Sequence, residues 1–210
     1  MRNTLIIGVI GVLLSCGGLV RAEYITIAIS GQVTKVSDQY NNFGGQISIG
    51  DVITGTYTYH STTFDSDPAS DMGVYDDYVS PAGMTLTVSG VVFETDTHNI
   101  DLYIGVNNDA HLEDKLNIAS NHNLPLSNGM LVQHIIWQLD DPTSTALSSD
   151  ALPLTAPDLT KWNSNVLNIS TDRNFGITAT ITSAVIVPEP CSILLLLAGG
   201  IVFHKQKHTR

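Results

Sequence analysis

The densest group of side chains able to do chemistry is the acidic segment DSDPASDMGVYDD, at residues 65–77. Its aspartates are Asp65, Asp67, Asp71, Asp76 and Asp77. Hard cations such as calcium take about six to eight oxygen ligands, which clustered carboxylates and loop carbonyls can supply. The segment does not follow the EF-hand pattern, because Ala69 and Ser70 stand where an oxygen ligand and a glycine are required. Two interpretations stay open, a calcium site and a solvated acidic turn.

The rest of the sequence contains no motif whose residue spacing is typical of a catalytic site. The histidines His60, His98, His111, His122 and His134 have no H-x-x-x-H spacing, so only folding could gather them into a zinc site. No G-x-S-x-G motif occurs, and no pair of carboxylates stands out as the acid and base of a glycosidase. We therefore expect a protein that is not an enzyme, with a polysaccharide hydrolase as an alternative.

Two tryptophans are candidates for sugar recognition. Trp137 and Trp162 can stack on sugar rings, although large aromatic residues also pack in cores and loops. Together with the acidic segment, they would suit a calcium-assisted carbohydrate-binding module.

Threonines recur at every second position in 54–58, 85–87, 95–97 and 178–182. Such rows are typical of the solvent faces of strands, where threonine fits well. Aligned on neighbouring strands, they would form a flat array of hydroxyl groups, as in ice-binding proteins. The sequence has no fixed repeat that would impose this alignment.

The elements that must position these side chains are strands. Apolar and polar residues alternate with a period of two in 24–30, 51–60, 84–90 and 174–187, and β-branched residues are frequent there. This pattern predicts half-buried strands. Weaker strand candidates are 91–95, 100–106, 131–139 and 165–170, and turn signals such as NNFGG and LSNG separate them.

No long amphipathic helix is expected in the core. The segment SSDALPLTAPDLTKW contains Pro153 and Pro157 and predicts a long loop with one helical turn near Asp158–Trp162. Many short strands joined by polar loops predict an all-β domain at residues 23–187. We expect an antiparallel β-sandwich, jelly-roll-like in its topology.

The N-terminal segment predicts export. Arg2 precedes the apolar run TLIIGVIGVLL, and Val20-Arg21-Ala22 offers a small-residue cleavage pattern. Residues 1–22 therefore read as a signal peptide cut after Ala22, since the apolar run is too short for a membrane anchor. Cys16 leaves lipoprotein processing as an alternative.

The core between the two end segments is strongly acidic. Residues 23–187 contain 4 basic and 19 acidic residues, for a net charge of −15. This charge argues against nucleic acid and anionic lipid as partners. Both cysteines, Cys16 and Cys191, lie outside this range, so the core has no disulfide.

The C-terminal segment 188–210 differs from the acidic core in being apolar and then basic. Residues 191–203 form an uncharged, mostly apolar run, and the tip after it carries Lys205, Lys207 and Arg210. As a helix this run would span about 20 Å, against roughly 30 Å of membrane hydrocarbon. It predicts a short membrane helix with its basic tip on the cytoplasmic side.

The order of Val187, Pro188, Glu189 and Pro190, an apolar run and a basic tip resembles the sorting signal of PEP-CTERM proteins. The segments GTYTYHSTTFDSDP and TALSSDALPLTAPDLTKW also resemble parts of other PEP-CTERM proteins, which implies a shared β-rich domain. The sorting resemblance implies a transient stay in the inner membrane through 191–203. It also implies cleavage near Pro188–Pro190 by an exosortase, a membrane-bound transpeptidase.

Such signals occur in bacteria that make exopolysaccharide. We therefore expect a non-enzymatic envelope or extracellular protein, structural or adhesive, that associates with exopolysaccharide. A calcium-assisted carbohydrate-binding module is the first alternative and a hydrolase the second.

Overall fold

The computed structural model describes residues 24–67, 69–109 and 112–188. Over these residues the chain is built from ten strands and one short 3₁₀ helix, η1 (Leu159–Lys161). The strands are β1 (Tyr24–Asp38), β2 (Val52–His60), β3 (Met72–Asp77), β4 (Gly83–Val88), β5 (Val91–Glu94), β6 (Leu102–Asn108), β7 (Asp114–Ser120), β8 (Val132–Asp141), β9 (Ser164–Thr171) and β10 (Phe175–Ile186).

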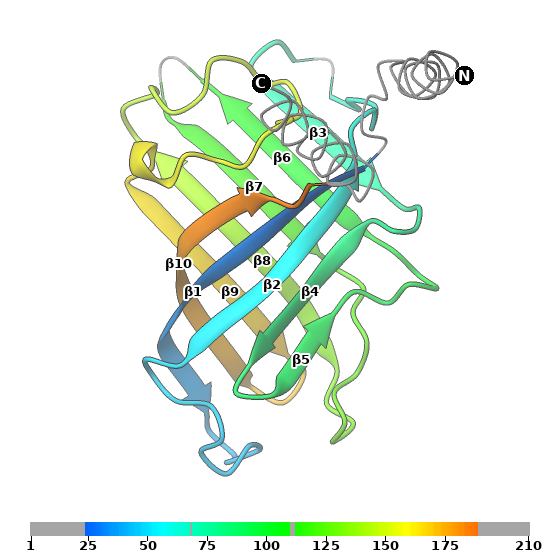
Figure 1. Cartoon of the computed structure of the whole chain (residues 1–210), viewed down its shortest axis with the longest axis vertical. Helices are drawn as coiled ribbons and strands as arrows, with labels where there is room; N and C mark the ends of the chain where they lie inside the picture. Colours follow the sequence, from blue (N-terminus) through cyan, green and yellow to red (C-terminus); the bar gives the residue numbers. More distant parts are fainter. Residues whose placement is uncertain (1–23, 68, 110–111, 189–210) are drawn as a thin grey trace, which may run out of the picture.

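All ten strands belong to one antiparallel sheet. Their order is β3-β6-β7-β8-β9-β10-β1-β2-β4-β5, so the chain's first and last strands lie in the middle (Figure 1). The all-β, antiparallel prediction is confirmed. The prediction of a jelly-roll-like sandwich is corrected, because a sandwich has two separate sheets and here β10 and β1 join both wings into a single one.

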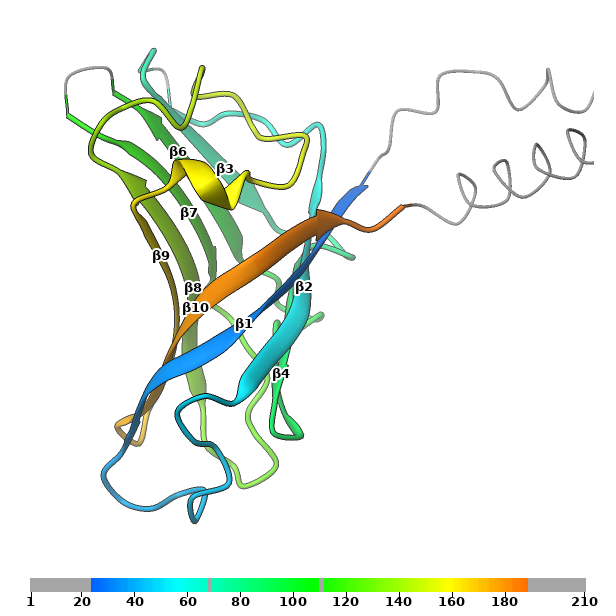
Figure 2. The same cartoon turned by 60° about the vertical axis from the view of Figure 1, so that its left-hand side comes forward.

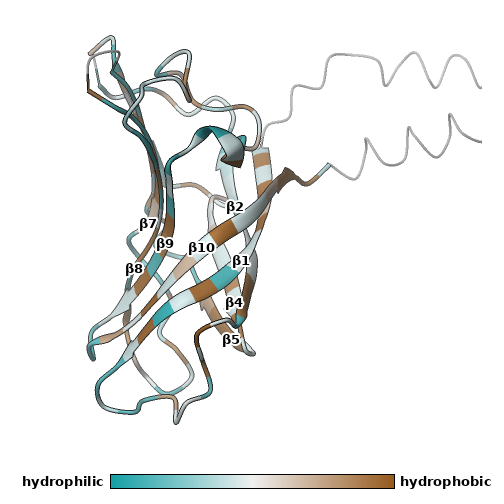
Figure 3. Cartoon of the chain, turned by 90° about the vertical axis from the view of Figure 1, so that its left-hand side faces the viewer, coloured by the Kyte–Doolittle hydropathy of each residue, from teal (hydrophilic) through white to brown (hydrophobic). Residues whose placement is uncertain are grey.

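The sheet curls into a half-barrel whose two wings face each other (Figure 3). Tyr57 on β2 and Trp137 on β8 have ring centroids 5.8 Å apart, although β9, β10 and β1 separate their strands in the sheet. The register between β1 and β10 shifts at Ser30/Gly31, which is where a bulge bends a strand. Gly31 permits this close approach, because a Cβ there would lie 2.2 Å from the Thr180 carbonyl oxygen.

Alternating side chains fill the interior of the half-barrel. On β1, Ile25, Ile27 and Ile29 are buried, whereas the residues between them are partly exposed. The alternation therefore predicts the buried face correctly. Two strands were not predicted, β3 and β7, because charged and amide residues interrupt their apolar pattern.

Loop 142–163 covers one end of the half-barrel, which we call the closed end (Figure 2). Its apolar side chains pack against the core, namely Leu147, Leu152, Ala156, Leu159 and Trp162. The Tyr59 hydroxyl donates to the Pro153 carbonyl at 2.5 Å, and the Tyr75 hydroxyl donates to the Asp150 carbonyl at 3.0 Å. The predicted helical turn is confirmed as η1, which Asp158 caps.

Two fully buried aspartates tie this loop to the sheet. Asp141 accepts five hydrogen bonds from the backbone N–H groups of 143, 145 and 146 and from the hydroxyls of Thr143 and Thr145. Asp114 lies opposite Asp141 in the ladder, and its Oδ2 accepts from Leu147 N at 2.8 Å. The loop is thus held by acceptors buried at the ends of β7 and β8.

The two ends of the described domain lie side by side. Ile27 pairs with Ile186, and Val187 N donates to the Thr26 carbonyl at 2.9 Å.

Val187 and Pro188 of the predicted sorting motif are described. Outside the described residues lie the rest of the motif, the signal peptide, the apolar run and the basic tip, that is Glu189, Pro190, 1–22, 191–203, Lys205, Lys207 and Arg210. Within the described part of the chain, no helix is long and apolar enough to cross a membrane.

Candidate functional site

The acidic segment uses its first carboxylates to shape its own loop. Asp65 Oδ1 accepts from Asp67 N at 3.0 Å and from Val74 N at 2.9 Å, and Asp67 Oδ1 accepts from Ala69 N at 2.8 Å. The backbone carbonyl of Asp71 accepts from Asn108 N at 2.8 Å. The carboxylate contacts are the local bonds expected of a polar turn, and the Asp71 carbonyl continues the pairing of β3 with β6.

The last two aspartates of the segment lie on opposite faces of β3. Asp77 is buried and accepts from His60 N and His60 Nδ1 at 2.8 and 2.7 Å. Asp76 faces outward, where partial burial and then the Asp101 charge raise its pKa. Among the described residues, no three histidine, cysteine, aspartate or glutamate side chains lie together as a metal site. The five aspartates are therefore not gathered around one point.

The histidines are equally dispersed over the described residues. His60 contacts Asp77, His98 approaches Asp96, and His122 approaches Asp101. His134 Nδ1 lies 3.3 Å from Asn121 Oδ1, and His111 lies outside the described residues.

The two tryptophans do not form a sugar platform. Trp137 is fully buried, and its indole N–H donates to Asn165 Oδ1 at 2.8 Å. It cannot touch a polysaccharide in this structure, because the alternation of β8 turns it into the core. Trp162 is partly exposed at the closed end, directly after η1, and packs against the core.

Two of the threonine rows come into register. Thr54 lies opposite Thr87 and Thr56 opposite Thr85, on the outer faces of β2 and β4. The rows at 178–182 and 95–97 lie elsewhere, on β10 and at the end of β5. The aligned group is thus confined to two neighbouring strands of a curled sheet.

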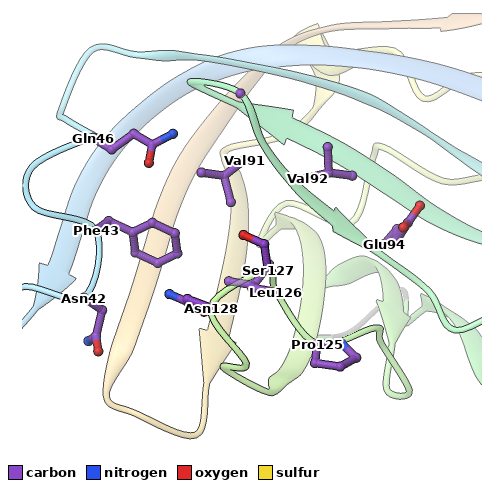
Figure 4. Close-up of a pocket in the computed structure, with 11 residues that line it drawn as sticks. Asn42, Phe43, Gln46, Val91, Val92, Glu94, Pro125, Leu126, Ser127 and Asn128 are labelled. Carbon is purple, nitrogen blue, oxygen red and sulfur yellow. The ribbon is translucent and has the colours of Figure 1, made fainter.

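The structure instead shows a cleft at the end of the half-barrel opposite loop 142–163, which we call the open end (Figure 4). The volume of the cleft is about 500 Å³. Three parts of the chain form it: the β1–β2 loop, the β4–β5 hairpin and the loop between β7 and β8. The lining residues are Asn42, Phe43, Gln46, Gly90, Val91, Val92, Glu94, Pro125, Leu126, Ser127 and Asn128.

The first wall of the cleft, loop 39–51, is held by two aspartates. Asp38 accepts from Asn42 N at 2.7 Å and from Phe43 N at 3.1 Å. Burial favours the neutral acid, but these N–H donors and the Asn42 amide outweigh it and lower the Asp38 pKa. At the other end of the loop, Asp51 accepts from the Ser89 hydroxyl at 2.5 Å and from Ser48 N at 2.9 Å, and its pKa is also lowered. The wall is therefore fixed before any ligand binds.

Phe43 anchors the same wall to the core. Its ring lies 4.5 Å from the Phe175 ring, centroid to centroid, and is tilted by 46°. With Val91, Val92, Pro125 and Leu126, it supplies the apolar part of the lining.

A buried hydroxyl network supports the second wall, loop 121–131. The hydroxyls of Thr95 and Ser120 lie 2.6 Å apart, and Ser120 Oγ donates to Asn123 Oδ1 at 2.7 Å. Thr95 Oγ1 also accepts from Met84 N at 2.8 Å. This network joins β4 and the end of β5 to the end of β7, across the two wings, and so ties loop 121–131 to both.

The edge of β5 faces the cleft between these walls. Glu94 O accepts from Leu124 N, whereas Thr95 N donates back to Met84 O, each at 2.9 Å. Because alternate residues of an antiparallel strand direct their backbone groups to opposite sides, Val92 turns its N–H and C=O away from β4, as Glu94 does. No described residue on that side hydrogen-bonds them.

Three amide side chains each hold the framework with one atom and leave the other for a ligand. Asn42 Nδ2 donates to Asp38 at 2.9 Å, and Gln46 Nε2 donates to the Ser89 carbonyl at 3.0 Å. Asn128 Oδ1 accepts from Met130 N at 3.1 Å. The remaining atoms, two carbonyl oxygens and one NH₂ group, add to the backbone of Val92 and the hydroxyl of Ser127. The cleft therefore offers both donors and acceptors beside apolar surface.

None of these lining residues was predicted as a site from sequence. The segment NNFGG, which contains Asn42 and Phe43, reads as a turn signal, and so does LSNG, which contains Ser127 and Asn128. The only available signal was that several amides and an aromatic residue occur in turns, where function is frequent.

Comparison with known proteins gives no relative for this chain. No family model, no curated protein and no solved structure matches it.

Proposed function

We propose that this chain is an exported, non-enzymatic envelope protein that binds exopolysaccharide through the cleft at the open end. The observation that carries the proposal is the chemistry of that cleft. Its unused amide, hydroxyl and backbone groups beside Phe43, Val91 and Leu126 suit a sugar chain, which has hydroxyls that both donate and accept and also apolar C–H faces.

The rigidity of the cleft supports the same proposal. Both walls are tied by hydrogen bonds to the sheet, through Asp38 and Asp51 on one side and Ser120 and Asn123 on the other. A preformed site loses little freedom when a ligand binds, which increases its affinity for the ligand.

The sorting part of the proposal rests on the two chain ends. The sequence resembles a PEP-CTERM protein at 187–210 and predicts a signal peptide at 1–22. The last strand ends at Ile186, and Val187 is still bonded to β1, so the motif Val187-Pro188-Glu189-Pro190 begins where the sheet ends.

Binding is tested by co-sedimentation of the exported protein with exopolysaccharide from the same cells. The protein is obtained from cells that express the full chain. We expect the Gln46→Ala/Asn128→Ala variant to need about ten times more polymer than wild-type protein for equal sedimentation. Equal sedimentation of both proteins would contradict the cleft as the binding site.

Sorting is tested separately by fractionation of the native host. We expect protein outside the inner membrane that lacks both 1–22 and the apolar run 191–203. Full-length protein retained in the inner membrane would contradict the sorting proposal and leave the cleft proposal standing.

A further inference from the structure

We propose that the cleft selects a glycan that carries a protonated amine, a glucosamine-type unit, and that Glu94 is the residue that recognises the amine. This inference rests on the proposed glycan-binding function and names the ligand class of the same site. Glu94 is the single charged residue among the described residues that line the cleft.

Glu94 has no ionic partner within the described part of the chain. It is partly exposed, lies opposite Thr85 in the β4–β5 ladder, and occurs in no ion pair of the described residues. Arg173 contacts loop 121–131 through the Gly129 carbonyl, at 3.5 Å, but does not line the cleft. The carboxylate is therefore available to a cation brought by the ligand.

The position of Glu94 suits a polymer better than a free ion. Figure 4 shows Glu94 and Pro125 at one end of the cleft and Asn42, Phe43 and Gln46 at the other, with Ser127 and Asn128 between them. A ligand that reaches Glu94 thus also passes the amides and the apolar lining. A small cation would find one carboxylate there and no second one among the lining residues.

The charge of the protein points the same way. The sequence between the end segments, 23–187, has a net charge of −15, so anionic polymers such as polyuronates are repelled. A neutral sugar leaves Glu94 unpaired, whereas an ammonium group gives it a charge-assisted hydrogen bond. Among glycans, the amine-bearing class therefore gains most from this cleft.

The test compares two soluble oligosaccharides of equal length, a glucosamine oligomer and its N-acetylated counterpart, by titration calorimetry at pH 6 on the exported protein from the full chain. The wild-type protein should bind the glucosamine oligomer about tenfold more tightly. Glu94→Gln keeps the side-chain shape and should abolish this preference without weakening the N-acetylated oligomer. Glu113→Gln is the matched control, because Glu113 lies beside Lys115, away from the cleft, and should keep the preference.

The outcomes separate the two proposals. If wild-type protein binds both oligomers equally, or if Glu94→Gln keeps the preference, the amine inference is wrong and glycan binding stands. If neither these oligomers nor the host exopolysaccharide binds, both proposals are wrong. Tighter binding of a lysine-containing peptide than of the glucosamine oligomer would overturn the choice of a glycan as the cationic ligand.

Discussion

The two ends of the half-barrel solve the same problem in opposite ways. Each must satisfy the polar backbone groups of the loops that connect neighbouring strands there. At the closed end, loop 142–163 inserts apolar side chains into the core, and Asp141 alone satisfies five donors. At the open end, loops 39–51 and 121–131 are tied to the sheet just as firmly but do not meet, so a cleft of about 500 Å³ stays between them.

This difference separates stability from binding. Both oxygens of Asp141 and Oδ2 of Asp114 accept hydrogen bonds from the protein, whereas Asp114 Oδ1 is buried with no hydrogen-bond partner among the described residues. The amides of the open end use only half of their capacity, and Glu94 has no ionic partner among the described residues. We therefore expect changes at the closed end to alter folding and changes in the cleft to alter ligand binding.

The largest effect is expected for Asp141→Asn. An amide has one acceptor oxygen instead of two, and in either orientation its NH₂ group would face a backbone N–H, that of Thr143 or those of Thr145 and Ala146. We predict a Tm lower by about 10 °C, measured by thermal unfolding. Asp140→Asn is the control, since Asp140 is only partly buried on the outer face and should change Tm by less than about 2 °C. If Asp141→Asn had the same Tm as wild type, the hydrogen bonds of Asp141 to loop 142–163 would not stabilise the fold.

The loss of stability at low pH should come from carboxylates that accept hydrogen bonds in the folded state. Hydrogen bonds from the Thr143 hydroxyl, Thr145 N and Thr143 N hold the pKa of Asp141 well below its usual range, and the pKa values of Asp38 and Asp51 are also lowered. A lowered folded-state pKa gives stability that is present above the unfolded value, near pH 4, and is lost as pH falls through the folded value.

We predict an almost constant Tm between about pH 7 and pH 5 and a fall of several degrees below about pH 4. Asp76 opposes this trend weakly, because its pKa is raised. In Asp141→Asn the decrease of Tm below about pH 4 should be smaller than in wild type. Melting curves at a series of pH values would measure the fall of Tm below about pH 4 in wild type and in Asp141→Asn. An equal fall in both proteins would show that groups other than Asp141 cause the loss of stability in acid.

A smaller effect is expected where the wings meet beneath the cleft. Gly83 has a φ of +145°, and a Cβ there would lie 2.8 Å from Thr95 Cβ. Gly83→Ala should therefore displace Thr95 and cost about 2 kcal/mol of unfolding free energy. Gly90, with a φ of +80° and nothing within 4 Å of an added Cβ, is the control, and Gly90→Ala should cost about 1 kcal/mol. Urea unfolding would measure both costs, and equal costs would show that Thr95 tolerates the methyl group.

The smallest effect on stability is expected inside the cleft. Gln46→Ala/Asn128→Ala removes two exposed amides and should leave Tm within about 2 °C of wild type. Its affinity for the glycan should fall about tenfold, since two hydrogen bonds to the ligand are lost together with the bonds that hold Gln46 to Ser89 and Asn128 to Met130. Leu154→Ala, an exposed residue of the closed end, should leave both quantities unchanged. An equal loss of affinity in Leu154→Ala would indicate that the glycan binds at the closed end, against the proposal.

The sequence predicted the strands better than the site. A period of two marks one buried face, so β1, β2, β4 and β10 were recognisable. It does not say whether one sheet or two results, because that depends on the β1–β10 pairing between residues far apart in the chain. The same long-range pairing turned Trp137 into the core and left the five aspartates of 65–77 dispersed.

The cleft could not be predicted for a related reason. Its walls come from three loops separated by tens of residues, and each loop alone reads as a polar turn. Only the curl of the sheet brings Gln46, Val92 and Asn128 around one space (Figure 4).

The most direct test is hydrogen–deuterium exchange of the exported protein with and without host exopolysaccharide. Exchange reports local opening and the hydrogen bonding of individual backbone segments. We predict that the polymer slows exchange in 89–96, which includes the free Val92 N–H, and in 121–131, and leaves 142–163 unchanged. Protection confined to 142–163, or none at saturating polymer, would contradict the assignment of the open end as the binding site.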